Sequence, residues 1–292
     1  MFPRNLSIVA EKHIGQRTNH NDLRRVVMNC VTSVLYDEAF FSRHSDATLQ
    51  SARIIVPHVL RKVRPRRVVD VGCALGAWLK VFAEHGAQVV HGLDGHYVDS
   101  SKLLIGKANF MPVDLVEMTQ GDLSPVMEKA DGGYDLAVCL EVAEHLPESS
   151  ASDLVRTLTT LAPIVLFSAA VPGQGGVGHI NEQWPSYWKS RFEEQGFQRF
   201  DPIRPRIWNN QRVHWWYRQN IFLFAAREQI ERSESLREQE RLPQIDVLYI
   251  HCFNRYRRLK SGLAEISKAL LKPLGPQASR RTEPRRDAER FS

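Results

Sequence analysis

Short apolar runs alternate with segments of helical periodicity through the middle of the chain. Strand-like runs occupy residues 68–71, 89–93, 136–140 and 164–167, with a final strand at 220–226 and helical segments at 77–84 and 150–161. Apolar residues at helical spacing over 49–60 predict a further helix before the first strand. Continuous apolar strands that alternate with helices are typical of a parallel sheet covered on both faces. The pattern therefore predicts an α/β fold with a doubly wound sheet.

The pattern changes after residue 226. Residues 228–241 are highly charged and predict a solvated helix, and beyond Pro243 a stripe of apolar residues with basic residues beside it predicts an amphipathic helix. The last stretch has the composition of a disordered tail. We therefore divide the chain into a cap segment at 1–47, a main domain at 48–226, a helical extension at 227–275 and a tail at 276–292.

The charge of the chain belongs mostly to its carboxyl-terminal part. Residues 227–292 carry 15 Lys and Arg against 10 Asp and Glu, which accounts for all but one of the six net positive charges. The nearly neutral main domain disfavours nucleic acid as a partner, because nucleic-acid binders usually carry a basic face. The basic amphipathic stripe predicts peripheral membrane contact, with packing on the domain or on a second subunit as the alternative. The sequence predicts no oligomeric state.

Nothing in the sequence predicts a secreted or membrane-spanning protein. The amino terminus lacks an apolar segment of signal-peptide length, and the longest apolar run, at 164–171, is too short to cross a bilayer. The cysteines are scattered without paired spacing, so we expect reduced thiols at Cys30, Cys73, Cys139 and Cys252. We therefore expect a cytoplasmic protein.

A glycine turn follows the first predicted strand of the main domain. Asp70 and Gly72 end that strand, Gly76 opens a helix, and Asp94 closes the second strand eighteen residues later. Such a turn exposes backbone N–H groups to a ligand, and a carboxylate at the second strand end can accept both hydroxyls of a ribose. These features fit either NAD or S-adenosylmethionine. Ala74 stands where a dinucleotide fingerprint needs glycine, which disfavours a diphosphate ligand.

The chain resembles the class I S-adenosylmethionine-dependent methyltransferases from about residue 36 to residue 226. The matching pieces are V-D-V-G-C-A-L-G-A-W at 69–78, G-L-D at 92–94, M-P-V-D-L at 111–115 and the run from Tyr134 to Pro147. The resemblance implies a Rossmann-like, mostly parallel, seven-stranded sheet and S-adenosyl-L-methionine as the cofactor. The residues that it implies for cofactor binding are Asp70, Gly72, Cys73 and Gly76 around the methionine part, Asp94 at the ribose, Asp114 at the adenine with Leu115 beside it, and Glu141 facing the methyl group.

A cluster of carboxylates and a histidine follows the predicted strand at 136–140. Glu141, Glu144 and His145 lie within five positions, and His179 follows in a glycine-rich loop. Oxygen and nitrogen ligands of this kind suit a hard divalent cation. The Glu-x-x-Glu-His pattern with a distal histidine resembles the metal site of the small-RNA 3′-end 2′-O-methyltransferases, and its first part recurs in the ubiquinone-pathway O-methyltransferases. By that resemblance Glu141, Glu144, His145 and His179 would bind Mg²⁺ or Mn²⁺.

Two other roles for this cluster are left open by the residues alone. A histidine, His145 or His179, could act without metal as the general base that an unactivated hydroxyl needs. Alternatively, Glu144 and His145 could cap the following helix. Glu144, His145 and His179 are therefore the candidate catalytic residues.

Two aromatic-rich runs, at 178–188 and 213–220, resemble a branch of methyltransferases associated with bacterial glycan biosynthesis. Tryptophan and tyrosine faces stack on sugar rings, and arginine and asparagine bind hydroxyls or anionic groups. We therefore expect an O-methyltransferase whose acceptor is a small molecule or glycan, with the hydroxyl on a sugar or its precursor. The alternatives are an RNA 2′-O-methyltransferase and a non-catalytic scaffold with a vestigial cofactor pocket.

Overall fold

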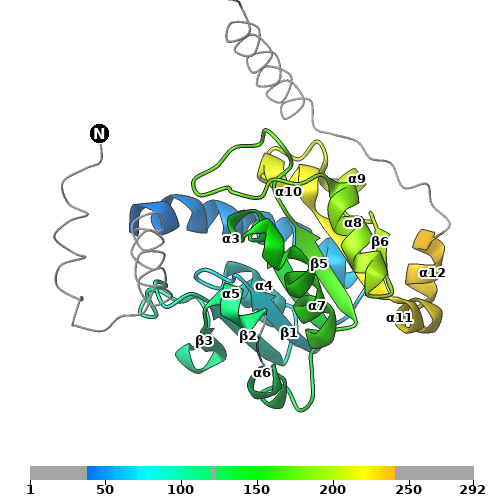
Figure 1. Cartoon of the computed structure of the whole chain (residues 1–292), viewed down its shortest axis with the longest axis horizontal. Coiled ribbons are helices and arrows are strands. Elements are labelled where there is room, and N and C mark those ends of the chain that lie inside the picture. Colours follow the sequence, from blue (N-terminus) through cyan, green and yellow to red (C-terminus); the bar gives the residue numbers. More distant parts are fainter. Residues whose placement is uncertain (1–37, 120, 122, 241–292) are drawn as a thin grey trace, which may run out of the picture.

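The computed structural model of the chain describes residues 38–119, 121 and 123–240. They form one sheet of seven strands in the order β3-β2-β1-β4-β5-β7-β6, with helices packed against it (Figure 1). The strands are β1 (Arg67–Val71), β2 (Val89–Asp94), β3 (Phe110–Pro112), β4 (Leu136–Leu140), β5 (Ile164–Ser168), β6 (Phe197–Phe200) and β7 (Phe222–Ala226). The predicted fold class, a Rossmann-like sheet with seven strands, is confirmed.

Alternate residues of the central strands point to two separate cores. Val68, Leu136 and Leu166 belong to a core shared with helices before and after the sheet, whereas Val69 and Ala137 belong to a second core. The first core includes residues of α3 (Glu38–Leu60), α4 (Ala77–Glu84), α9 (Arg204–Ile207) and α10 (Trp215–Asn220); the second includes residues of α6 (Ser124–Glu128), α7 (Ala151–Leu161) and α8 (Pro185–Glu194). Strands buried on both faces explain the continuous apolar runs in the sequence.

One strand, β7, runs in the opposite direction to the other strands of the sheet. All neighbouring strands among β1, β2, β3, β4 and β5 pair in parallel. Strand β7 pairs antiparallel with both β5 and β6. The sheet is therefore mostly parallel, as predicted. Our prediction of a final strand beginning at Asn220 is wrong at its start, because Asn220 ends helix α10 and the strand begins at Phe222.

The carboxyl-terminal extension is described only in part. Residues 227–240 form two short helices, α11 (Arg227–Arg232) and α12 (Glu234–Glu240), rather than the single helix that we predicted, and each buries one aliphatic side chain, Ile230 and Leu236. The amphipathic stripe beyond Pro243, the tail and most of the cap segment lie outside the described residues. Helix α3 crosses the predicted boundary at 47/48. Among the described helices, none has the length and apolar character needed to cross a membrane.

The turns that carry the candidate site follow parallel strands at one edge of the sheet. Strands β1, β2, β3, β4 and β5 run in the same direction, so their carboxyl ends meet there. A short helix, α5 (Leu115–Met118), follows β3, and 3₁₀ turns occupy Lys107–Asn109, Ala143–His145 and Glu148–Ser150. The second of these turns contains two residues of the predicted carboxylate and histidine cluster, Glu144 and His145.

Candidate active site

The turn after β1 depends on left-handed backbone. Gly72 (φ 83°) and Gly76 (φ 81°) both occupy the region that favours glycine. A Cβ at Gly72 would lie 2.3 Å from Cγ2 of Val142, so the absence of a side chain lets the turn after β4 pack against the turn after β1. Ala74 (φ 48°) takes the left-handed conformation without being glycine, at a cost of roughly 1 kcal/mol. The two turns are therefore in direct contact.

Asp94, the last residue of β2, joins the second strand to this turn. Its Oδ2 accepts a hydrogen bond from the N–H of Ala74 (2.7 Å), and its Oδ1 accepts from the N–H of Gly95 (2.7 Å) and the hydroxyl of Tyr97 (2.6 Å). Burial raises the pKa of Asp94, and these hydrogen bonds oppose the shift because they favour the ionised form. A fixed carboxylate thus lies where we predicted the ribose contact.

Asp114 lies just beyond the end of β3, the strand that pairs with the β2 strand of Asp94, and it is the N-cap residue of α5. Its Oδ1 accepts hydrogen bonds from the N–H groups of Val116 (2.9 Å) and Glu117 (3.3 Å). Leu115 is half-buried as the first residue of that helix. The cap fixes the Asp114 side chain at the same sheet edge as Asp94, which is the arrangement that the predicted nucleoside site requires.

Asp70 is a buried acceptor without a donor. Its side chain is 2% exposed, and Oδ2 has no hydrogen-bond partner among the described residues. Burial, and secondarily the charge of Asp94, raise the pKa of Asp70 well above its usual value. Burial likewise raises the pKa of the Cys73 thiol, which packs so closely on β2 that a Cβ at Gly92 would lie 2.6 Å from its sulfur. Cys73 is therefore a neutral packing residue of the turn.

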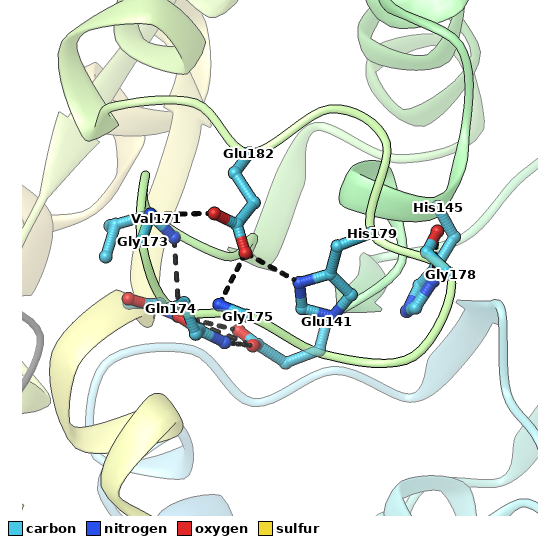
Figure 2. Close-up of polar contacts among 10 residues, drawn as sticks. Glu141, His145, Val171, Gly173, Gln174, Gly175, Gly178, His179 and Glu182 are labelled. Atoms are coloured by element: carbon cyan, nitrogen blue, oxygen red, sulfur yellow. Dashed lines mark hydrogen bonds and ion pairs between the residues drawn. The ribbon is translucent and has the colours of Figure 1, made fainter. Parts of the chain in front are cut away.

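Glu141 follows β4 in a left-handed conformation (φ 57°) and is held by polar side chains from distant segments (Figure 2). Its Oε2 accepts a hydrogen bond from Nε2 of Gln174 (2.8 Å), and its Oε1 accepts from Nδ2 of Asn220 (3.1 Å). Its backbone N–H donates to the carbonyl oxygen of Ser168 (3.0 Å). Burial raises the pKa of Glu141, and the hydrogen bonds from Asn220 and Gln174 oppose that shift. Neither Gln174 nor Asn220 was predicted as a site residue.

Three of the four predicted metal ligands come together. Potential ligand atoms of Glu144, His145 and His179 all lie within 4.8 Å of one another, and Glu141 is not part of this group. Glu144 is completely buried, and neither carboxylate oxygen has a hydrogen-bond partner among the described residues. Burial, followed by the nearby charge of Glu141, raises the pKa of Glu144 well above its usual value. A buried carboxylate that faces two imidazoles and has no donor fits a cation.

The two histidines meet edge to face, with ring centroids 4.8 Å apart. Burial, and then His179, lower the pKa of His145 to about 4, while a hydrogen bond to the carbonyl oxygen of Gly178 (3.3 Å) acts in the opposite direction. His145 is therefore neutral near pH 7, as both a metal ligand and a base require. The alternative in which Glu144 and His145 cap the next helix does not hold, because α7 begins after Ser150 without a side-chain cap.

Glu182 is a site residue that the sequence analysis missed (Figure 2). Its Oε1 accepts hydrogen bonds from Nδ1 of His179 (3.0 Å) and the N–H of Gly175 (2.6 Å), and its Oε2 accepts from the N–H of Gly173 (2.7 Å). Burial acts to raise the pKa of Glu182, but these hydrogen bonds outweigh it and lower the pKa overall. The only sequence signal was the spacing of three residues from His179.

The loop over 172–183 brings apolar side chains beside His179. Among the described residues the exposed large hydrophobic side chains are Val177 (51% exposed) and Ile180 (62% exposed). Both flank His179 in the sequence, and the loop contains no lysine or arginine. We call Val177 and Ile180 the apolar rim. Trp188, in the first of the two aromatic-rich runs, is a core residue as expected and packs against Phe167 at a centroid distance of 5.2 Å.

Comparison with known proteins gives one family and several partial relatives. A family model described as a methyltransferase domain matches residues 50–220. The ubiquinone biosynthesis O-methyltransferase of Acinetobacter baumannii (strain ACICU) is 30% identical over 98 residues, which is 33% of this chain and 39% of that protein. The protein of the same description from Neisseria meningitidis serogroup C is 29% identical over 101 residues, 34% of this chain and 40% of that protein. The chain thus spans about two fifths of the length of the curated relatives it matches.

Among solved structures, the magnesium protoporphyrin IX methyltransferase of Synechocystis PCC 6803 with bound S-adenosylmethionine is 18% identical. The structural match covers 73% of this chain and 100% of the Synechocystis chain, with a TM-score of 0.46.

Proposed function

The chain belongs to the methyltransferase-domain family, and from that premise we propose that it transfers the methyl group of S-adenosylmethionine to a hydroxyl oxygen. One observation carries the proposal: the glycine turn packs directly on Val142, in the turn that also holds Glu141, Glu144 and His145. A cofactor bound at the first turn would therefore lie against the carboxylate and histidine cluster. A scaffold with a vestigial pocket would have no need for this juxtaposition.

The residues present fit the cofactor. Asp70 offers a buried carboxylate oxygen, Oδ2, that lacks a donor among the described residues, which suits the ammonium group of the methionine part. Asp94 and Asp114 offer acceptors at adjacent strand ends for the ribose hydroxyls and the adenine amine. S-adenosylmethionine carries no phosphate, so Ala74 in place of a glycine is compatible with it.

The acceptor is activated by the cluster of Glu144, His145 and His179. These residues would hold a Mg²⁺ or Mn²⁺ ion, and Glu144 fits that role because its buried carboxylate has no other partner. Such an ion, when bound, would lower the pKa of a coordinated hydroxyl, so that the hydroxyl proton is released to water. In the metal-free alternative, Nε2 of His179 takes the hydroxyl proton. The oxygen then forms its bond to the methyl carbon, the carbon–sulfur bond breaks, and the electron pair stays on the sulfur of S-adenosylhomocysteine.

We propose a sugar hydroxyl as the acceptor, on a molecule with an apolar part. The exposed apolar rim flanks His179 in the sequence, and the loop carries no lysine or arginine that would favour a nucleotide-linked sugar or an RNA backbone. A lipid-linked sugar precursor combines the hydroxyl and the apolar part.

A methyl-transfer screen with mass readout tests the proposal. The acceptors are matched pairs of free and octyl-linked sugars, together with nucleotide sugars, a phenolic acceptor and small RNAs, each with chelator alone or with added Mg²⁺ or Mn²⁺. We expect transfer to octyl-linked sugars that chelation abolishes and the metal restores. Transfer to RNA alone would reject the acceptor class, and full activity in excess chelator would reject the metal. Asp94→Ala, which should bind the cofactor about 10- to 100-fold more weakly, is the control and should be slower than wild type at limiting S-adenosylmethionine.

A further inference from the structure

We propose that Glu182 is the positioning residue for His179, holding its imidazole in the form that presents Nε2 to Glu144 and His145. The inference rests on the proposed function, because it gives His179 its role in methyl transfer. Glu182 lies outside the set of predicted metal ligands and catalytic residues.

The Glu182 carboxylate accepts hydrogen bonds from three residues of its own loop. Gly173, Gly175 and His179 all donate to its carboxylate, at 2.7, 2.6 and 3.0 Å. Gly173 (φ 86°) and Gly175 (φ 67°) are left-handed, which is how successive N–H groups can turn toward one carboxylate. The side chains of His179 and Glu182 are 12% and 20% exposed, so water competes little for this pair.

The hydrogen bond to Glu182 determines which ring nitrogen of His179 keeps its lone pair. A neutral imidazole has one N–H donor and one acceptor nitrogen, and a carboxylate only accepts. Nδ1 must therefore carry the hydrogen that Glu182 accepts, which leaves the lone pair on Nε2. A metal ligand and a general base both need that lone pair. The carbonyl oxygen of Gly178 likewise only accepts, so Nδ1 of His145 is the donor in their hydrogen bond.

Glu182 also connects His179 to the side chains around Glu141. Gln174 lies between the two glycines that Glu182 binds, and its amide donates to Glu141 (2.8 Å) and accepts from Asn220 (2.9 Å). One carboxylate thus fixes both the loop that carries His179 and the loop that supports Glu141. Its contacts do not include the residues of the glycine turn, so we expect cofactor binding to be independent of it.

Nitrogen-15 NMR of the histidine rings, with His179 assigned from a His179→Ala spectrum, tests the inference without depending on activity. Spectra are recorded in chelator at about pH 8, well above the usual histidine pKa of about 6.5. We expect the Nδ1–H form in the wild type. Glu182→Ala should populate the Nε2–H form, and Glu182→Gln, whose amide oxygen still accepts, should keep the Nδ1–H form. Glu193→Gln, which removes a half-exposed carboxylate paired with Lys189, is the matched control and should change nothing.

Steady-state kinetics then separate positioning from a structural role. We expect kcat to fall about 10- to 100-fold in Glu182→Ala and less in Glu182→Gln, with KM for S-adenosylmethionine within about twofold of wild type. If Glu182→Ala keeps the Nδ1–H form of His179 and the wild-type kcat, the inference is wrong. If Glu182→Ala does not fold, an Nε2–H form in Glu182→Gln overturns the inference and the Nδ1–H form supports it. If the wild type shows no methyl transfer but Glu182→Ala changes the tautomer, only the proposed function fails.

Discussion

Gly176→Ala is the substitution that most directly tests the position of His179. A Cβ at residue 176 would lie 2.2 Å from Nε2, 2.5 Å from Cε1 and 2.7 Å from Cδ2 of His179. Gly176 is not among the glycines with positive φ, so alanine fits the backbone there, and the imidazole must move instead. Reaching an ordinary contact of 3.4 Å requires a shift of about 1 Å. The clash is with the far end of a side chain, so the fold should tolerate it.

The expected result is a large loss of rate with little loss of stability. A displacement of about 1 Å in a catalytic group costs on the order of 100-fold, which corresponds to about 2.7 kcal/mol of barrier. We expect kcat to fall by about that factor, S-adenosylmethionine affinity by calorimetry to stay within about twofold, and the free energy of unfolding in urea to change by less than about 1 kcal/mol.

The control is Gly106→Ala, which makes the same substitution in open space. Gly106 has φ −59°, and the nearest atom to its added Cβ is Nδ2 of Asn109 at 3.8 Å. We expect this variant to have the kcat of the wild type. His179→Ala combined with Gly176→Ala should be no slower than His179→Ala alone, because both act through one imidazole. Wild-type kcat in Gly176→Ala would show that His179 does not act from the position described.

Three further predictions concern the carboxylates. Asp94→Ala should weaken S-adenosylmethionine binding about 10- to 100-fold in calorimetry, because hydrogen bonds to a charged group are worth about 1.5–3 kcal/mol; unchanged affinity would refute the ribose assignment. Burial raises the pKa of Asp70, so the unfolded chain loses this proton at lower pH than the folded protein, and folded stability falls as pH rises from 3.8 upward. Asp70→Asn should therefore exceed the wild-type Tm by a margin that grows with pH while binding the cofactor more weakly; a constant margin would contradict this. Asn220→Ala should cost about 1–3 kcal/mol in urea unfolding and lower kcat, because Glu141 loses a donor; a stable, fully active variant would show that Asn220 is dispensable.

Strands β1, β2, β4 and β5 were predictable because burial on both faces leaves continuous apolar runs, whereas the short, partly exposed strand β3 was not predicted. The cofactor turn was predictable because its geometry depends on residue type, with glycine at 72 and 76. Glu182 and Gln174 were not, because their contacts are made within an irregular loop whose path is set by left-handed glycines rather than by any periodicity. Asn220 was misplaced in a strand because it directly precedes the apolar run at 221–226, yet it is the last residue of helix α10, which packs on the core.

The position of β7 has a consequence for how the protein is made on the ribosome. Among the described strands β6 pairs only with β7, so it cannot join the sheet until β7, which is synthesised after it, has emerged. Until then the nascent chain has an open edge at β5, a surface on which other chains can pair. Asn220 lies two residues before β7, so Glu141 gains this donor in the same step. Synthesis therefore completes the hydrogen bonds of Glu141 and covers the edge of β5 together, and a chain released before this point would have neither.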